Sequence, residues 1–136
     1  MELYIGVDFH PYQQTICWCD SETGELRTRE IMHKDREELV QFYRQLPTSI
    51  IGIEATSPAG WFEELLFENK HKLWIGDPAK ISKRAESRHK SDKRDAEHIY
   101  NLLSEGRFPA IWRRTPENVA ILNLIGLRAA LVKERT

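Results

Sequence analysis

Two short apolar runs, each carrying an acidic residue at its end, constrain the fold of this chain more than any other feature. Leu3–Phe9 carries Asp8 near its end, and Ile50–Glu54 ends in Glu54 itself. Apolar runs of this length are typical of buried strands. A carboxylate there costs free energy unless a cation or a hydrogen-bond donor compensates it. The two strand ends therefore indicate a functional site that includes Asp8 and Glu54.

The order of the predicted elements narrows the fold class. Three strands are followed by a helix, a strand, a helix and a strand, over residues 3–9, 15–20, 26–32, 35–45, 49–53, 61–69 and 72–75. This order predicts an α/β, ribonuclease H-like (RuvC-like) fold with a mixed five-stranded sheet flanked by helices. In such a fold the first and fourth strands are parallel neighbours. The carboxyl ends that carry Asp8 and Glu54 would then adjoin, where open α/β sheets usually place their sites.

A second acidic pair lies in a predicted helix from Asp92 to about Glu105. Asp92 and Asp95 are three residues apart, so they share one face of that helix. If the fold brings this pair to Asp8 and Glu54, the four carboxylates form an oxygen site suited to Mg²⁺ or Mn²⁺. Two other interpretations stay open. The helical pair could serve only the helix dipole, and Glu54 could pair with a nearby Lys or Arg.

The net charge of −1 hides an asymmetry along the chain. Residues 1–70 carry 13 acidic and 6 basic side chains, whereas residues 71–136 carry 8 acidic and 14 basic ones. This pattern suits a polyanion held beside a metal site, although a solvated basic face is the alternative. The predicted nucleic-acid contacts are the densest basic stretch: Lys80, Lys83, Arg84, Arg88, Lys90, Lys93 and Arg94.

Several single residues have competing interpretations. His10 could exchange a proton or contact phosphate, or it could be a turn histidine without a catalytic role. His89 and His98 are predicted to be surface residues. Trp61 is predicted to pack the second helix on the sheet. Cys17 and Cys19, two residues apart, are predicted to be reduced residues of the core.

The C-terminal part predicts a further helix. Thr115-Pro116-Glu117 is a typical helix start, and many apolar residues follow it. We therefore predict a catalytic domain over residues 1–112 and, over 113–136, the start of a helical segment that continues in a longer protein. The sequence has no apolar run long enough for a membrane span and no signal peptide, so we expect a cytoplasmic protein without a membrane partner.

Four motifs in order resemble a known family. They are Tyr4-Ile5-Gly6-Val7-Asp8-Phe9-His10, Gly52-Ile53-Glu54-Ala55-Thr56-Ser57 with Trp61, Asp77-Pro78, and Lys90-Ser91-Asp92-Lys93-Arg94-Asp95-Ala96. Together they resemble the N-terminal domain of the DEDD-motif transposases of bacterial insertion sequences and the related pilin-gene inverting recombinases. The chain departs from the usual pattern at Pro11, where the family often has lysine, and at Ser91, where threonine is frequent.

The resemblance implies a RuvC-like fold in which Asp8, Glu54, Asp92 and Asp95 hold divalent metal, Mg²⁺ or Mn²⁺. It implies DNA recombination as the process, with DNA and a structured guide RNA as partners. It also implies a homo-oligomer, in which a separate C-terminal domain supplies a serine nucleophile to a composite site between protomers.

Three other functions remain as alternatives. A free-standing Mg²⁺-dependent nuclease, such as a Holliday-junction resolvase or a ribonuclease H-like enzyme, would cleave phosphodiesters by itself. A non-catalytic nucleic-acid-binding module would bind without cleavage. An ATP-binding domain of the actin and sugar-kinase type is disfavoured, because His10-Pro11-Tyr12-Gln13-Gln14 replaces the glycine and hydroxyl residues of a phosphate-binding hairpin.

Overall fold

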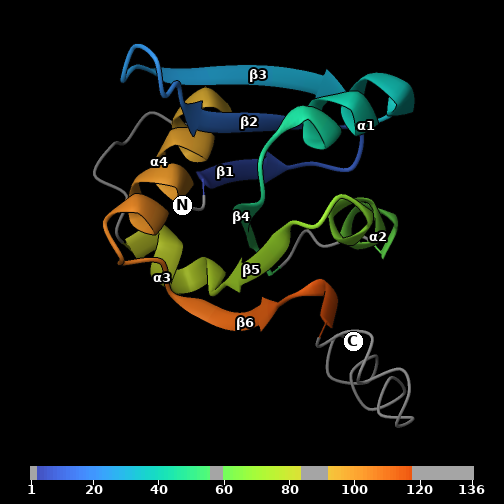
Figure 1. Ribbon diagram of the computed structural model, residues 1–136. Coiled ribbons are helices and arrows are strands. Elements are labelled where there is room, and N and C mark those ends of the chain that lie inside the picture. The colour runs from blue at the N-terminus through green and yellow to red at the C-terminus, as the bar shows by residue number, and fades with distance from the viewer. Residues whose placement is uncertain (1–2, 56–59, 84–91, 118–136) are drawn as a thin grey trace, which may run out of the picture.

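The computed structural model of the protein describes residues 3–55, 60–83 and 92–117, with the side chains of Lys83 and Asp92 excepted (Figure 1). In chain order the elements are β1 (Leu3–Phe9), β2 (Gln13–Cys19), β3 (Leu26–Met32), α1 (Arg36–Gln45), β4 (Ser49–Glu54), α2 (Gly60–Glu68), β5 (Lys72–Gly76), α3 (Pro78–Lys83), α4 (Asp92–Ser104) and β6 (Ala110–Arg114). The predicted C-terminal helix lies largely outside the described residues, and the predicted division after residue 112, which falls within β6, stays a prediction.

The strands form one mixed sheet in the order β3-β2-β1-β4-β5-β6. β1, β2 and β3 make an antiparallel meander, whereas β4 is parallel to both β1 and β5. The predicted ribonuclease H-like class and the parallel pairing of the first and fourth strands are therefore confirmed. The sheet also has a sixth strand that the sequence did not predict. β6 is short and ends in two arginines, and it is antiparallel to β5 at the edge of the sheet.

Helices cover both faces of the sheet, and each face has its own core (Figure 1). One core joins β-strand residues such as Ile5 and Ile53 to Leu39 and Tyr43 of α1 and Phe62 of α2. The other core contains Ile81 of α3, residues Ile99, Leu102 and Leu103 of α4, and Phe108. Because side chains alternate along a strand, residues two apart in β1 or β4 face the same core.

Two glycines let α4 approach the sheet closely. A Cβ atom at Gly6 would lie 2.5 Å from the Ala96 carbonyl oxygen, which belongs to the backbone of α4. A Cβ atom at Gly52 would lie 2.8 Å from Cδ1 of Leu103. The backbone contact at Gly6 leaves no room for a side chain. Gly6 and Gly52 are also register partners in β1 and β4, so α4 packs directly over the parallel strand pair.

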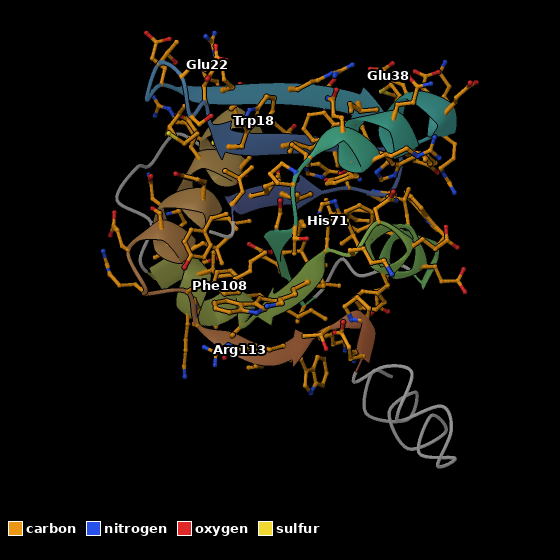
Figure 2. The ribbon with its side chains drawn as sticks, in the orientation of Figure 1. Trp18, Glu22, Glu38, His71, Phe108 and Arg113 are labelled. Carbon is orange, nitrogen blue, oxygen red and sulfur yellow. The ribbon has the colours of Figure 1, made fainter. Side chains whose placement is uncertain are left out.

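A buried histidine joins the layers on the opposite face. His71 is fully buried in the interior of the protein (Figure 2). Its Nδ1 accepts a hydrogen bond from the Ser49 backbone N–H at 3.2 Å, and its Nε2–H donates to the Tyr43 carbonyl oxygen at 2.7 Å. The ring therefore ties the end of α1 to the start of β4. Burial lowers the pKa of His71, which keeps this ring neutral.

Candidate functional site

The register of β1 and β4 sets the relation between Asp8 and Glu54. Tyr4 pairs with Ile50, and Gly6 pairs with Gly52. Asp8 and Glu54 each lie two residues beyond this last register pair, toward the carboxyl ends of the two strands. Both lie on the face that α4 covers, because side chains alternate along each strand. Each is partly buried, as expected for carboxylates at the edge of a packed sheet.

Helix α4, which carries the second acidic pair at its start, covers the same face of the sheet. It packs against β1 and β2 and also contacts β4. Ala96 lies directly over Gly6, and Asp95 immediately precedes Ala96 and is half-buried. Asp92 is the first residue of α4, although its side chain lies outside the described residues. The buried Ala96 and Ile99 share the helical face that begins at Asp92 and Asp95.

His10 contacts the first of the four acids directly. Its Nε2 lies 2.8 Å from Asp8 Oδ2, and because a carboxylate can only accept, the ring N–H donates. The side chain of Asp8 is 17% exposed and that of His10 is 36% exposed. The hydrogen bond fixes the orientation of the Asp8 carboxylate. His10 is therefore placed to orient Asp8.

The donor set fits a hard divalent cation in its chemistry. Asp8, Glu54 and Asp95 offer carboxylate oxygens, the ligands that Mg²⁺ and Mn²⁺ prefer. Within residues 3–55, 60–83 and 92–117, no three His, Cys, Asp or Glu side chains lie close enough to hold a metal ion. The side chain of Asp92 lies outside the described residues. The assembly of all four acids around a metal therefore stays a prediction.

The predicted basic contacts divide into two groups. Lys80 on α3, with Lys93 and Arg94 in the first turn of α4, have exposed side chains. The others lie outside the described residues or have undescribed side chains: Lys83, Arg84, Arg88 and Lys90. His89 also lies outside them. The prediction that His98 is a surface residue was wrong, because this ring is half-buried. Its Nε2 lies 2.9 Å from the Ile81 carbonyl oxygen, so His98 connects α4 to α3.

Other predictions concern the packing near the site. Trp61 does pack α2 on the sheet, with its ring centroid 5.8 Å from that of Phe9. Cys17 is buried and Cys19 is half-buried, and neither forms a disulfide. The structure also contains a buried ion pair that the sequence did not indicate, Glu63 with Arg114, whose charged atoms are 2.7 Å apart. No local pattern could have paired two residues that are 51 positions apart.

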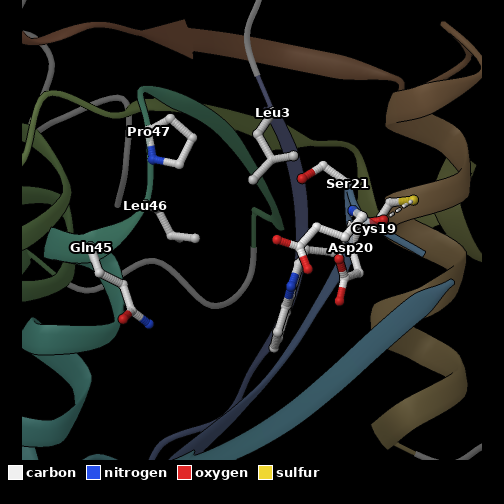
Figure 3. Close-up of a pocket in the computed structure, with 9 residues that line it drawn as sticks. Leu3, Cys19, Asp20, Ser21, Gln45, Leu46 and Pro47 are labelled. Atoms are coloured by element: carbon white, nitrogen blue, oxygen red, sulfur yellow. Dashed lines mark hydrogen bonds between the residues drawn. The ribbon is translucent and has the colours of Figure 1, made fainter. Parts of the chain in front are cut away.

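A cavity of about 780 Å³ lies away from the acids (Figure 3). Its lining residues are Leu3, Trp18, Cys19, Asp20, Ser21, Glu22, Gln45, Leu46 and Pro47. Leu3 begins β1, whereas Asp8 is near the end of that strand. The cavity is therefore separate from the candidate site at Asp8 and Glu54, and the acidic residues that line it are Asp20 and Glu22. In the described part of the chain, no helix is long and apolar enough to cross a membrane.

Comparisons with known proteins show which sequences this chain is similar to. The model of the family of DEDD transposases of the IS110 type, described as "Transposase", matches residues 5–136, a range that includes all four acids. The chain is also 30% identical over 101 residues to a protein of Sinorhizobium fredii (strain NBRC 101917 / NGR234) named "Putative transposase y4pF/y4sB". This alignment covers 74% of the chain and 26% of the relative, so the chain spans about a quarter of the relative's length.

Proposed function

Because this chain belongs to the DEDD transposase family, we propose that it is the metal-binding catalytic domain of a DNA transposase or site-specific recombinase that acts on DNA phosphodiesters. The observation that supports this most is the position of Asp8 and Glu54 at the ends of two parallel strands, each two residues beyond the register pair Gly6 and Gly52, on the face that α4 crosses. Such an edge concentrates negative charge where a divalent cation can compensate it.

Each residue has a defined role in this proposal. Asp8, Glu54, Asp92 and Asp95 would hold Mg²⁺ or Mn²⁺, and the bound metal would neutralise charge on the phosphoryl oxygens. His10 orients Asp8 through its 2.8 Å hydrogen bond. The basic residues of α3, of the start of α4 and of the segment between them would contact the phosphate backbone. Such contacts position a nucleic acid but do not read its sequence.

The remaining partners belong to the whole protein. We propose that a C-terminal serine-bearing domain completes the site and that the whole protein works in the cytoplasm as a homo-oligomer. DNA is the proposed substrate, and a structured guide RNA is a further proposed partner. The division at residue 112 into a catalytic domain and a connecting helical segment is part of this proposal.

A metal titration tests the site itself. Mn²⁺ should bind to the chain, as measured by calorimetry, and should raise its melting temperature. Asp8→Asn and Glu54→Gln should weaken this binding strongly, because each removes one anionic oxygen ligand. Glu22→Gln is the matched control, since Glu22 is exposed in the turn between β2 and β3, at the opposite end of the sheet from the carboxyl ends of β1 and β4. Equal Mn²⁺ affinity in Asp8→Asn and in the unchanged chain would refute the proposed site.

A second experiment separates a transposase domain from a self-sufficient nuclease. The purified chain is incubated with branched DNA and with RNA–DNA hybrids in the presence of Mn²⁺. A domain that needs a serine-bearing partner should leave both substrates intact. Robust cleavage that Asp8→Asn abolishes would instead favour a Holliday-junction resolvase or ribonuclease H-like enzyme.

A further inference from the structure

The turn between β1 and β2 presents an aromatic side chain to solvent beside the acidic site. Tyr12 is 76% exposed, more than the two other large hydrophobic residues that are exposed in the described part of the chain, Ile111 at 48% and Leu26 at 39%. It lies four residues after Asp8 and two after His10, which donates to Asp8. The position of Tyr12 in the fold therefore links it to the candidate site.

Backbone hydrogen bonds hold this turn in one conformation. The His33 backbone N–H donates to the Tyr12 carbonyl oxygen at 2.7 Å, and the His10 N–H donates to the Gln13 carbonyl oxygen at 2.8 Å. The His33 ring reaches the same turn through Nδ1, which lies 3.3 Å from the Pro11 carbonyl oxygen. The backbone on both sides of Tyr12 is thus attached to the body of the protein.

The hydrogen bonds behind the turn form one consistent set. A carbonyl oxygen only accepts, so His33 Nδ1 carries the proton and Nε2 must accept. The Gln14 amide N–H donates to that Nε2 at 3.2 Å, and the Gln14 Oε1 accepts from the Tyr43 hydroxyl at 2.6 Å. Gln14, His33 and Tyr43 are all buried. Because buried polar groups are costly unless satisfied, this chain of bonds rigidly supports a turn whose own side chain points into water.

Aromatic packing holds His33 on its other sides. Its ring centroid is 4.7 Å from that of Phe9 and 5.0 Å from that of Trp61. The guanidinium of Arg36 lies 3.7 Å from the Trp61 ring centroid. Lys34 and Arg36 are exposed cations beside the turn, with the exposed Asp35 between them. The surface near Tyr12 therefore combines an aromatic ring with positive charge.

We propose that Tyr12 stacks on an unpaired nucleobase of the nucleic acid that the acidic site holds. The proposal rests on the proposed function for the nature of this ligand. The four residues from Asp8 to Tyr12 can extend over at most ~14 Å. Tyr12 is therefore within about four nucleotides of Asp8, at a spacing of ~3.4 Å per nucleotide along one strand. A stacking ring on a preorganised turn loses little conformational entropy on binding. Base–aromatic stacking also tolerates any base sequence.

Binding measurements without metal test this role separately from the acids. The probes are a fluorescein-labelled oligodeoxythymidine, an oligouridine of the same length, and an abasic sugar–phosphate strand of equal charge. Anisotropy is recorded in a buffer with a chelator. The unchanged chain should bind the base-bearing strands more tightly than the abasic strand. Comparison of the deoxythymidine and uridine probes shows whether DNA or RNA supplies the base.

Substitutions then assign the preference to Tyr12. Tyr12→Ala should weaken binding of the base-bearing strands by about 5- to 150-fold and should leave abasic binding unchanged. Tyr12→Phe should retain the preference, because it keeps the ring. Leu26→Ala is the control, since Leu26 is exposed and pairs with Cys19 at the opposite end of the sheet.

Three results would overturn the inference. These are no binding of any probe by the unchanged chain, equal binding of base-bearing and abasic strands, and an unchanged preference in Tyr12→Ala. The Mn²⁺ titration of Asp8 is independent of all three, so failure of the stacking proposal and failure of the metal site can be distinguished. Melting curves of each variant show whether the fold is retained.

Discussion

Arg114 and Glu63 form an ion pair inside the protein, with 2.7 Å between Nη1 and Oε1 and only 9% and 8% of their side chains exposed. Arg114 ends the edge strand β6, and Glu63 lies in the first turn of α2. The pair therefore joins β6, the strand that the sequence did not predict, to α2. A buried charge that loses its partner is strongly destabilising, whereas an intact pair is close to neutral relative to apolar residues.

Glu63→Ala should lower the free energy of unfolding by about 3–5 kcal/mol, because it leaves the Arg114 guanidinium buried without this carboxylate. Urea denaturation measures the change. The double variant Glu63→Leu with Arg114→Leu should recover much of the loss. As a control, Glu105→Ala removes the exposed partner of Arg107 and should cost less than about 1 kcal/mol. Equal losses at Glu63 and Glu105 would contradict the buried pair.

Gly6→Ala should destabilise the protein more than Gly52→Ala. The new methyl group at Gly6 would meet backbone atoms of α4, which cannot move without displacing the helix. At Gly52 it would meet the side chain of Leu103, which can change rotamer. Overpacking of this kind costs about 1–3 kcal/mol, and occasionally more, so we expect Gly6→Ala at or above the upper end. Chemical denaturation of both variants checks the order, and the reverse order would refute close packing of α4 on β1.

The free energy of unfolding should fall as the pH is lowered below about 6.5. Burial lowers the pKa of both His33 and His71 from the usual 6.5, and for His33 the nearby Arg36 and His10 lower it further. Between the folded pKa and 6.5 the unfolded chain therefore binds protons that the folded chain does not. The contribution of these two histidines to stability is fully present above 6.5 and is lost progressively as the pH falls from 6.5 to the folded pKa values.

Each of these two histidines can contribute a slope of up to about 1.4 kcal/mol per pH unit. Denaturation curves measured from neutral to mildly acidic pH give that slope, and His71→Gln should reduce it. Nitrogen-15 NMR should show the proton on Nδ1 of His33 and on Nε2 of His71, as their hydrogen bonds require. Imidazolium signals for both residues at neutral pH would rule out this account.

Cys17 should react slowly with iodoacetamide in the native protein. Burial, together with the nearby Glu97 and Cys19, raises the pKa of its thiol to about 12, against an opposing effect of Lys93. Because the thiolate is the nucleophile, little of it exists at neutral pH. Mass spectrometry should find the half-buried Cys19 labelled first, and Cys17 only after denaturant unfolds the chain. Rapid native labelling of Cys17 would contradict this packing of α4 on β2.

Much of the architecture was predictable because it depends on local periodicity. Buried faces are indicated by the apolar runs of β1 and β4 and by the helical spacing of apolar residues in α1 and α4. β6 was not predictable, because a short segment with two arginines does not have a clear strand pattern. Arg114 can be buried there only because Glu63 lies 2.7 Å away. His98 was misjudged for a similar reason, since α3 was not predicted as a helix that packs on α4.

The sequence by itself determined which residues could make the candidate site and which family the chain resembles. Asp8 and Glu54 follow apolar runs, and Asp92 and Asp95 share a helical face, and these relations are local. Only the tertiary structure decided that α4 packs closely over the parallel strand pair at Gly6 and Gly52, and that His33 supports the turn of Tyr12. Such pairings depend on the distances and side-chain orientations between separate elements, which the pattern of residues along a chain does not specify.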